Sequence, residues 1–339
     1  MKFSFLIPAY NSEKYISNCI HSILKQSCPD WECVIVDDGS TDGTGKLIDE
    51  FAAGDSRIKT LHKENEGVAL ARNAGSDLCT GDYILCVDSD DCIDKDLLKI
   101  VSEKMGGENS IDMICFGYKK IMGQSEETVV DAFQEGFYEE EKLNEIRNNF
   151  LFDERNREDN EGAMSYSMCT KLIRRDFFIR NKDLAAKRIR LGEDMLFVLR
   201  ALMESRRILV LHDALYYYNL GIESSATHNY RKGDIANGYS VLQELMEMAG
   251  HNTCYLRQAC HFIINYLWNQ YIFCALRTQQ YKEFRQEIGE ETDKGLLFRT
   301  KAIHFNARHR MFDLKRSLIS NNRLLIIYCF YKLKYCWMK

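Results

Sequence analysis

The first 120 residues alternate between short apolar runs and amphipathic segments, and this alternation constrains the fold more than any other feature. The apolar runs that predict strands are residues 3–7, 32–36, 58–62, 83–87 and 112–116. The segments that predict helices are residues 13–26, 46–53, 68–78 and 96–104. Such alternation is typical of an α/β fold with a mostly parallel central sheet flanked by helices.

Polar turns follow three of the predicted strands, at residues 8–10 (PAY), 37–40 (DDGS) and 88–91 (DSDD). In open α/β sheets, ligands bind beyond the carboxyl ends of the strands. Because all three turns lie at those ends, we expect them to meet at one edge of the sheet and to form a single site.

The turn at residues 88–91 is acidic. Side chains alternate along a strand, so Asp88 and Asp90 leave on the same side if the extended conformation persists. Oxygen ligands without nearby His or Cys favour Mg²⁺ or Mn²⁺ over zinc. The alternative is that Asp91 or Asp94 caps the helix at 96–104 while the other carboxylates are solvated.

The composition narrows the functional classes. The net charge of −5 argues against a protein built mainly to coat nucleic acid, so we expect no nucleic-acid partner. The 13 cysteines include no C-x-x-C pair, which argues against a disulfide framework and favours a reducing compartment. Residues 3–7 are too short for a signal peptide, and no stretch reaches the roughly 18 apolar residues of a bilayer span. We therefore expect a cytoplasmic protein.

Residues 121–230 are less regular. They begin with an acidic, weakly periodic stretch at residues 126–145 and contain a charge run at residues 153–162. This run is either a solvated loop or has a lid or acceptor-binding role. The later segments that predict strands are residues 171–174, 208–211 and 215–218, and the one that predicts a helix is residues 194–205.

The sequence becomes helical after about residue 231. We therefore predict an α/β domain at residues 1–230, with halves 1–120 and 121–230, and a helical extension at residues 231–339. The last segment, 308–339, holds eight Lys and Arg and a single acid. It fits a helix lying on an anionic membrane surface, peripheral at the inner face, or equally a helix docked on its own domain.

Four motifs together resemble one family. They are PAYN at 8–11, VDDGSTD at 36–42, N-x-G at 65–67 with ARN at 71–73, and GDY at 81–83 leading to VDSDD at 87–91. In order and spacing they resemble the family 2 glycosyltransferases, which are inverting enzymes of the GT-A fold. The similarity is continuous over residues 1–95 and resumes at 171–172, 192–194 and 216–218.

The resemblance implies a nucleotide-sugar donor, with UDP as its nucleotide. The residues it places at the donor are Pro8, Ala9, Tyr10, Asp38, Gly67, Arg72, Asp88 and Ser89. The chemistry agrees, because a base needs an acceptor for its imide N–H, which Asp38 can supply, and a flat surface, which Tyr10 can supply. Alternatively, residues 37–42 form only a capped strand-to-helix turn, and Arg72 lies at the surface.

The resemblance also implies the catalytic groups. Asp194, with Glu193 beside it, matches the family's acidic pair at a helix start and is the candidate base that accepts the proton of the acceptor hydroxyl. Asp88 and Asp90, with Asp91, are the candidate ligands of Mn²⁺ or Mg²⁺. The alternative is that Glu193 and Asp194 merely favour the start of a helix.

Two departures refine the expected reaction. Asn219 stands where such families often carry a basic residue, and the Gln-x-x-Arg-Trp signature of processive synthases is absent. We therefore expect a hexosyltransferase that moves one sugar per encounter to a glycan or lipid-linked saccharide in surface polysaccharide synthesis.

Other functions fit less well. Residues 40–47 (STDGTGKL) narrowly miss the P-loop pattern, lacking its first glycine and its final hydroxyl. A nucleotidyltransferase of related fold, and a sugar-nucleotide-binding module without catalysis, stay as alternatives.

Overall fold

The computed structural model describes residues 1–108, 110–151, 164–186, 189–220, 234–250, 252, 254–265, 282 and 285. Contacts group the chain into two units. The first comprises Met1–Arg147, Ala163–Arg188 and Glu193–Glu223, and the second comprises Asn148–Gly162, Ile189–Gly192 and Ser224–Lys339. The predicted boundary at residue 230 stays a prediction. Within the described residues, no helix has both the length and the apolar character to cross a bilayer.

Four parallel strands form the first half of the sheet in unit 1. Their order is β3 (Ile58–Lys63), β2 (Trp31–Asp38), β1 (Phe3–Ala9) and β4 (Tyr83–Cys86). Every residue of β1, β2 and β4 is buried, because helices cover both faces of the sheet. This half has the parallel arrangement that the alternation of the sequence predicts.

The second half of the sheet is mixed. Its strands are β5 (Cys92–Ile93), β6 (Met113–Met122), β7 (Ser125–Val129), β8 (Gly136–Glu139), β9 (Lys171–Arg174) and β10 (Arg207–Asn219). β9 runs antiparallel between β4 and β6, whereas β10 is parallel to β6. β5, β7 and β8 add antiparallel pairs. The whole is a mixed α/β sheet flanked by helices.

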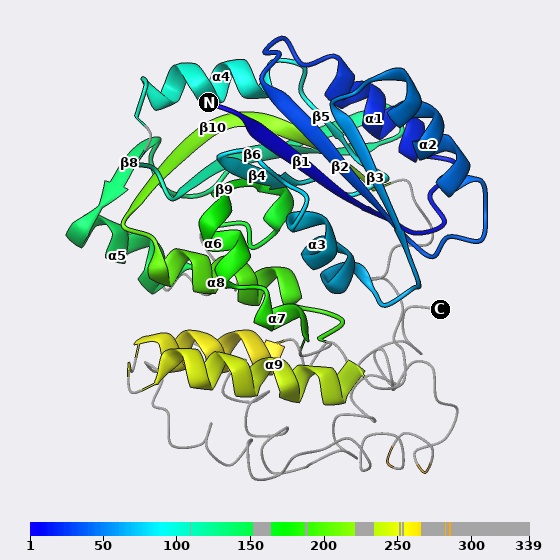
Figure 1. The fold of residues 1–339 in the computed structure, drawn as a ribbon. Helices are drawn as coiled ribbons and strands as arrows, with labels where there is room; N and C mark the ends of the chain where they lie inside the picture. Colours follow the sequence, from blue (N-terminus) through cyan, green and yellow to red (C-terminus); the bar gives the residue numbers. More distant parts are fainter. Residues whose placement is uncertain are drawn as a thin grey trace. The chain divides into compact units, whose positions relative to one another are not determined.

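Helices cover the two faces of the sheet (Figure 1). One face carries α1 (Ile16–Leu24), α2 (Thr44–Gly54) and α4 (Leu97–Met105). The other carries α3 (Val68–Ser76), α6 (Arg175–Arg180) and α8 (Glu193–Glu204), near the short α7 (Asp183–Ala186). The split follows from right-handed crossovers, since β1 to β3 progress in one direction and the step from β3 to β4 reverses it.

Several elements differ from those predicted. Residues 208–211 and 215–218 belong to one strand, β10, whose register against β6 shifts between Val210 and Ala214. The acidic stretch forms β7, β8 and α5 (Glu140–Asn149), which the sequence did not predict. The charge run at 153–162 and the basic segment 308–339 lie outside the described residues.

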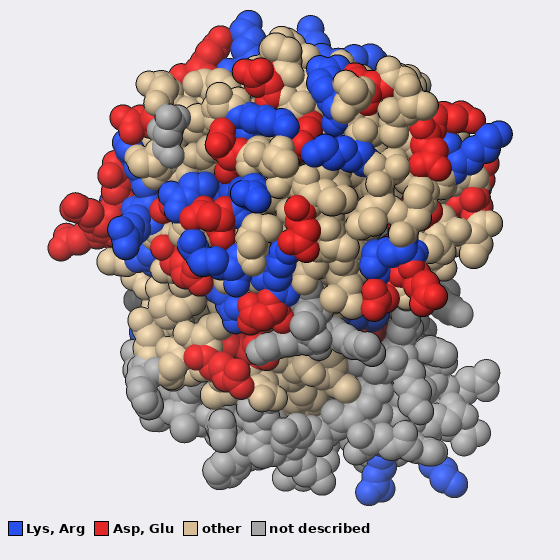
Figure 2. Space-filling view, in the orientation of Figure 1, with Lys and Arg blue, Asp and Glu red and all other residues tan. Residues whose placement is uncertain are grey.

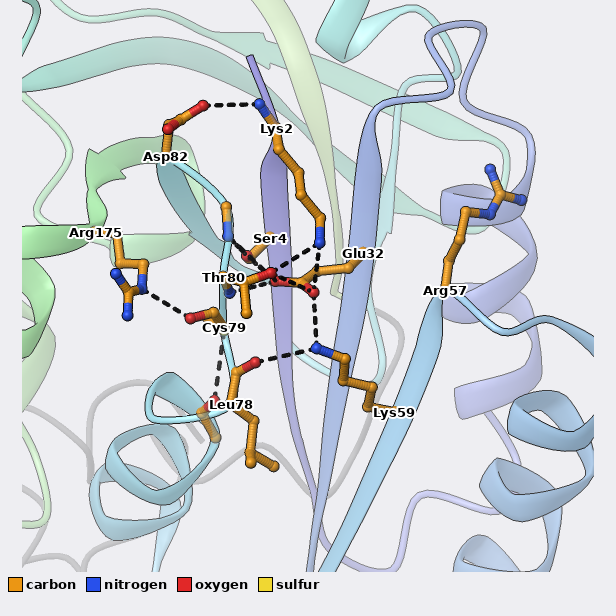
Figure 3. A network of polar contacts seen from close by, with 12 residues as sticks. Lys2, Ser4, Glu32, Arg57, Lys59, Leu78, Cys79, Thr80, Asp82 and Arg175 are labelled. Carbon is orange, nitrogen blue, oxygen red and sulfur yellow. Dashed lines mark hydrogen bonds and ion pairs between the residues drawn. The ribbon is translucent and has the colours of Figure 1, made fainter.

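A polar network closes the amino-terminal end of the parallel strands (Figure 3). Glu32, at the start of β2, is 2% exposed. Its carboxylate accepts hydrogen bonds from Ser4 Oγ at 2.7 Å and from Lys2 Nζ and Lys59 Nζ at 2.9 Å each. The backbone N–H of Thr80 also donates to it. Burial opposes ionisation of Glu32, but these donors outweigh burial and hold its pKa far below the ordinary value.

Charges of both signs lie on one face of the molecule. Figure 2 shows Lys and Arg interspersed with Asp and Glu on the face that it presents. Charges on this face therefore compensate one another locally and do not build a field of one sign.

Unit 2 contains α9 (Asp234–Ala249) and a helical stretch at residues 254–265. The segment at 189–192 is bound to α9 within this unit. Arg190 forms an ion pair with the buried Asp234, and the backbone N–H of Arg190 donates to Asn237 Oδ1 at 2.7 Å. Asn237 Nδ2 donates back to the Leu191 carbonyl at 2.8 Å.

Candidate active site

The turns after β1 and β2 are joined by reciprocal hydrogen bonds. Asn11 donates its backbone N–H to Ser40 Oγ at 3.0 Å, and its Oδ1 accepts the Thr41 N–H at 2.8 Å. The next residue, Ser12, donates its backbone N–H to Thr44 Oγ1 at 2.8 Å. Asn11 adopts a positive φ of 50°, a conformation that asparagine tolerates well. Hydrogen bonds therefore tie the segments that follow β1 and β2 to each other.

The acidic turn joins the same edge. The hydroxyls of Ser12 and Ser89 lie 2.6 Å apart, within hydrogen-bond distance, although 77 positions separate them along the chain. The segments that follow β1, β2 and β4 thus meet beyond the carboxyl ends of these parallel strands. The strands run further than predicted, because β1 includes Pro8 and Ala9 and β2 includes Asp37 and Asp38.

The residues of the predicted base-binding segment differ in exposure. Tyr10 is 50% exposed, so its ring is free to present a flat surface to a ligand. Pro8 and Ala9 lie inside β1 with buried side chains. Any contact of Pro8 or Ala9 with a ligand must therefore use their backbone.

Asp38 is buried at the end of β2. Its Oδ1 accepts hydrogen bonds from Lys63 Nζ at 3.0 Å and from the Glu66 N–H at 3.1 Å, and its Oδ2 accepts the Gly67 N–H at 2.8 Å. Gly67 has a φ of 97°, a region that glycine enters without strain. Asp38 therefore holds the loop before α3, a role that the sequence did not predict and that adds to the proposed contact with a base.

Arg72 connects the acidic turn to the candidate base. This α3 side chain is buried, and its guanidinium donates through Nη2 to Asp88 Oδ1 at 3.0 Å and through Nη1 to Asp194 Oδ1. Glu193 Oε1 lies 3.8 Å from Nη1. The sequence allowed a surface position for Arg72, and the structure excludes it. Arg72 therefore brings together Asp88 and Asp194, which lie 106 positions apart in the sequence (194 minus 88).

The acidic pair at the start of α8 lies in two environments. Asp194 has one oxygen on Arg72, and its Oδ2 accepts the backbone N–H of Met168 at 3.2 Å. Burial, together with the charge of Asp194, raises the pKa of Glu193 despite the nearby arginine. Both residues lie beside Arg72, so a preference of acidic residues for a helix start does not by itself account for their position.

The three acids of the acidic turn are not equivalent. Both oxygens of the buried Asp91 are engaged, by the Tyr216 hydroxyl at 2.6 Å and the Asn219 N–H at 2.8 Å. Burial and the charge of Asp88 raise the pKa of Asp91 to about 8. Asp91 therefore anchors the turn, and the metal role that the sequence suggested for Asp88, Asp90 and Asp91 stays a prediction.

Asp88 and Asp90 offer carboxylate oxygens, the kind of ligand that a hard divalent cation takes. Burial and the charge of Asp88 raise the pKa of Asp90, as expected for carboxylates whose repulsion a cation relieves. Oxygen-only donors suit Mg²⁺ or Mn²⁺. Among the described residues, no group of three or more His, Cys, Asp or Glu gathers into a ready-made site. Two carboxylates plus ligand oxygens would therefore have to complete the coordination.

Tyr216 is a site residue whose role the sequence left unassigned. Its hydroxyl donates to Asp91 and accepts the backbone N–H of Asp88 at 3.2 Å, so β10 fixes the acidic turn. The resemblance to the family included residues 216–218, but the sequence pattern could not show that Tyr216 binds the acidic turn. Asn219 contributes its backbone N–H to the same carboxylate.

The comparisons with known proteins agree with this geometry. A family model described as glycosyl transferase family 2 matches residues 4–181, more than half of the chain. The chain belongs to glycosyl transferase family 2.

Curated relatives carry glycosyltransferase names. The uncharacterized glycosyltransferase EpsJ of Bacillus subtilis is 31% identical over 215 residues, which cover 63% of this chain and 60% of EpsJ. The poly(ribitol-phosphate) beta-N-acetylglucosaminyltransferase TarS of Staphylococcus aureus is 30% identical over 222 residues, which cover 64% of this chain and 35% of TarS. The chain thus spans less than two thirds of the length of either relative.

Solved structures share the fold. The crystal structure of S. aureus TarS 1–349 in complex with UDP-GlcNAc has a TM-score of 0.69 at 22% identity, covering 98% of this chain and 92% of that one. The same fragment in complex with UDP has a TM-score of 0.66. These similarities confirm the expected GT-A architecture.

Proposed function

We propose that this family 2 member is an inverting glycosyltransferase that moves one sugar from a nucleotide sugar, with UDP as the nucleotide, to a hydroxyl of a glycan or lipid-linked acceptor. The observation that carries the proposal is the buried Arg72, which holds Asp88 of the acidic turn and Asp194 of α8 on one guanidinium. Asp88, on the donor side, and Asp194, on the acceptor side, therefore both bind the same guanidinium. A displacement at a single carbon requires the donor and acceptor groups to be this close.

The donor nucleotide binds at the joined turns. The exposed ring of Tyr10 supplies a stacking surface, and Asp38 supplies the acceptor for the imide N–H of the base. Asp38 keeps capacity for this bond because each carboxylate oxygen has two lone pairs, although three protein donors already contact it. The UDP complexes of the TarS fragment support UDP as the first nucleotide to test.

The chemical step is a single displacement. The acceptor oxygen attacks the anomeric carbon, the bond from that carbon to the diphosphate oxygen breaks, and UDP leaves with the electron pair. Asp194 takes the proton of the acceptor hydroxyl. The guanidinium of Arg72 and the N–H of Met168 hold the Asp194 carboxylate in a fixed orientation for that transfer.

Asp88 and Asp90 are the residues that would hold a divalent cation. When bound there, Mn²⁺ or Mg²⁺ supplies Lewis-acid stabilisation of the charge that develops on the leaving diphosphate. Asp91 and Tyr216 keep the turn that carries these two acids in place.

The test is a panel of UDP-, GDP- and TDP-sugars, with UDP-GlcNAc first, incubated with the protein and Mn²⁺. Slow release of the nucleoside diphosphate without acceptor is expected for UDP-sugars, since water can replace the acceptor hydroxyl. Tight UDP binding without any hydrolysis or transfer over the whole panel would instead establish a binding module and overturn the proposal.

A further inference from the structure

Lys171 is a buried charged residue that has no role in the proposed reaction. It is the first residue of β9 and is 0% exposed, although its side chain carries an ammonium group. Burying a charge is costly unless hydrogen bonds or a countercharge compensate for it. The partners of Lys171 therefore indicate what the fold gains from placing it there.

All three ammonium donors are used within one loop. Lys171 Nζ donates to the carbonyl oxygens of Ser165 and of Ser167, the latter at 3.2 Å, and to Thr170 Oγ1 at 3.0 Å. Asp131 holds the same loop from the other side, because its Oδ1 accepts the Ser165 N–H at 2.8 Å. Lys171 thus closes residues 165–170 into a fixed loop.

One of these bonds leads directly to the candidate base. The carbonyl oxygen of Ser167 and the N–H of Met168 belong to the same peptide group. Lys171 binds the oxygen of that group, and the N–H donates to Asp194 Oδ2 at 3.2 Å. A cation on the oxygen polarises the amide and strengthens N–H donation at its other end. A peptide therefore links a buried positive charge to Asp194.

We propose that Lys171 is a positioning residue for the reaction proposed above. Acting through the Ser167–Met168 peptide, it aims and polarises the N–H that holds one oxygen of Asp194, while Arg72 holds the other. The inference rests on the proposed function, because it requires Asp194 to be the base. Lys171 itself contacts neither donor nor acceptor.

A double-mutant cycle tests the proposal. Wild type, Lys171→Met, Asp194→Asn and the double variant are compared for kcat, for the KM of the donor and for UDP affinity by calorimetry. Lys171→Met is expected to lower kcat by about 10- to 100-fold while UDP affinity changes less than about twofold. In the Asp194→Asn background the same substitution is expected to change kcat less than about twofold, because its target is already lost.

The control removes a different lysine, whose partner is a carboxylate at the other end of the sheet. Lys59→Met loses an ion pair with Glu32 at the opposite end of the strands and is expected to leave kcat unchanged. If Lys171→Met does not fold, Lys171→Gln, which keeps two N–H donors without the charge, replaces it in the cycle.

The outcomes separate this inference from the proposed function. Equal losses of kcat from Lys171→Met in both backgrounds, or no loss in wild type, would overturn the positioning role alone. Full activity in Asp194→Asn would overturn the assignment of the base, and the role of Lys171 with it.

Discussion

The two ends of the same parallel strands place buried and half-buried carboxylates in opposite electrostatic environments. At the amino-terminal end, Glu32 has two lysines, a serine and a backbone N–H as donors, and its pKa is far below the ordinary value. At the carboxyl-terminal end, burial and mutual repulsion raise the pKa values of Asp90 and Asp91. Similar side chains in one sheet therefore stabilise the fold at one end and strain it at the other.

The difference lies in the balance of partners. Glu32 is compensated by groups of its own chain, so it is complete without a ligand. At the carboxyl-terminal end, Arg72 of α3 is shared among Asp88 of the acidic turn and Glu193 and Asp194 of α8, so three carboxyl groups face one guanidinium. Uncompensated charge of this kind is typical of sites that await a ligand of the opposite sign. The predictions below test this contrast from its strongest consequence to its weakest.

The largest effect is expected at the candidate base. Asp194→Asn should lower kcat by about 1,000-fold, because the amide cannot accept the proton of the acceptor hydroxyl. UDP affinity, measured by calorimetry, should stay within about twofold, since the base acts on the acceptor. Asp183→Asn, an exposed acid on α7, is the control and should keep wild-type kcat. Parallel losses of UDP affinity and kcat in Asp194→Asn would contradict the assigned role.

A substitution in the acidic turn should lower activity but raise stability. Asp90→Asn is expected to lower metal-dependent kcat by about 100-fold, because a cation loses one of its two protein ligands. The free energy of unfolding without metal should rise by about 0.5–1 kcal/mol, since a repelled carboxylate is removed. Urea unfolding and turnover with and without EDTA measure both quantities. A less stable variant would show that Asp90 is not strained.

The opposite end should lose stability without losing activity. Glu32→Gln is expected to lower the free energy of unfolding by about 2 kcal/mol, because Lys2 and Lys59 lose their shared anion. The pKa of Glu32 is lowered in the folded state from 4.5, so its contribution is present above about pH 4.5 and is lost as the pH falls toward the folded pKa. The variant should therefore show a flatter acid limb of stability against pH. The exposed Glu50→Gln is the control.

The smallest effect is expected at His62. Hydrogen bonds to Asp37 and Asp49 raise the pKa of His62, so its contribution is present below about pH 6.5 and is lost as the pH rises through the folded pKa. Because His62 is about half exposed, the difference between pH 6 and pH 9 should be below about 0.5 kcal/mol. Urea unfolding of wild type and His62→Gln at both pH values measures it. A wild type that gains stability over this range relative to the variant would reverse the sign.

The sequence predicted the parts of the fold that depend on local pattern. The strands and helices of the first 120 residues repeat a βα unit, and each carries its own apolar period. β7 was missed because four of its five residues are exposed, so it has no apolar period to detect. β10 was read as two strands because a polar interruption at His212 and Asp213 coincides with its register shift.

In the candidate site, too, local features were predicted and long-range contacts were not. The three turns were predicted because parallel strands place their carboxyl ends together. The contact between Arg72 and Asp194 was not predicted, because Asp194 lies 122 positions away and no local pattern encodes such a contact. The engagement of Asp91 by Tyr216, 125 positions away, escaped prediction for the same reason.

The long strand β10 also limits how an enzyme of this design can diversify. Its adjacent tyrosines reach back into the first half of the unit, where Tyr216 and Tyr217 bind Asp91 and Asp94. A fragment that ends before residue 207 would lack both tyrosines, so Asp91 and Asp94 would lose these hydrogen bonds. Chimeras that seek new acceptor preferences should therefore exchange surface loops and keep this aromatic pair intact.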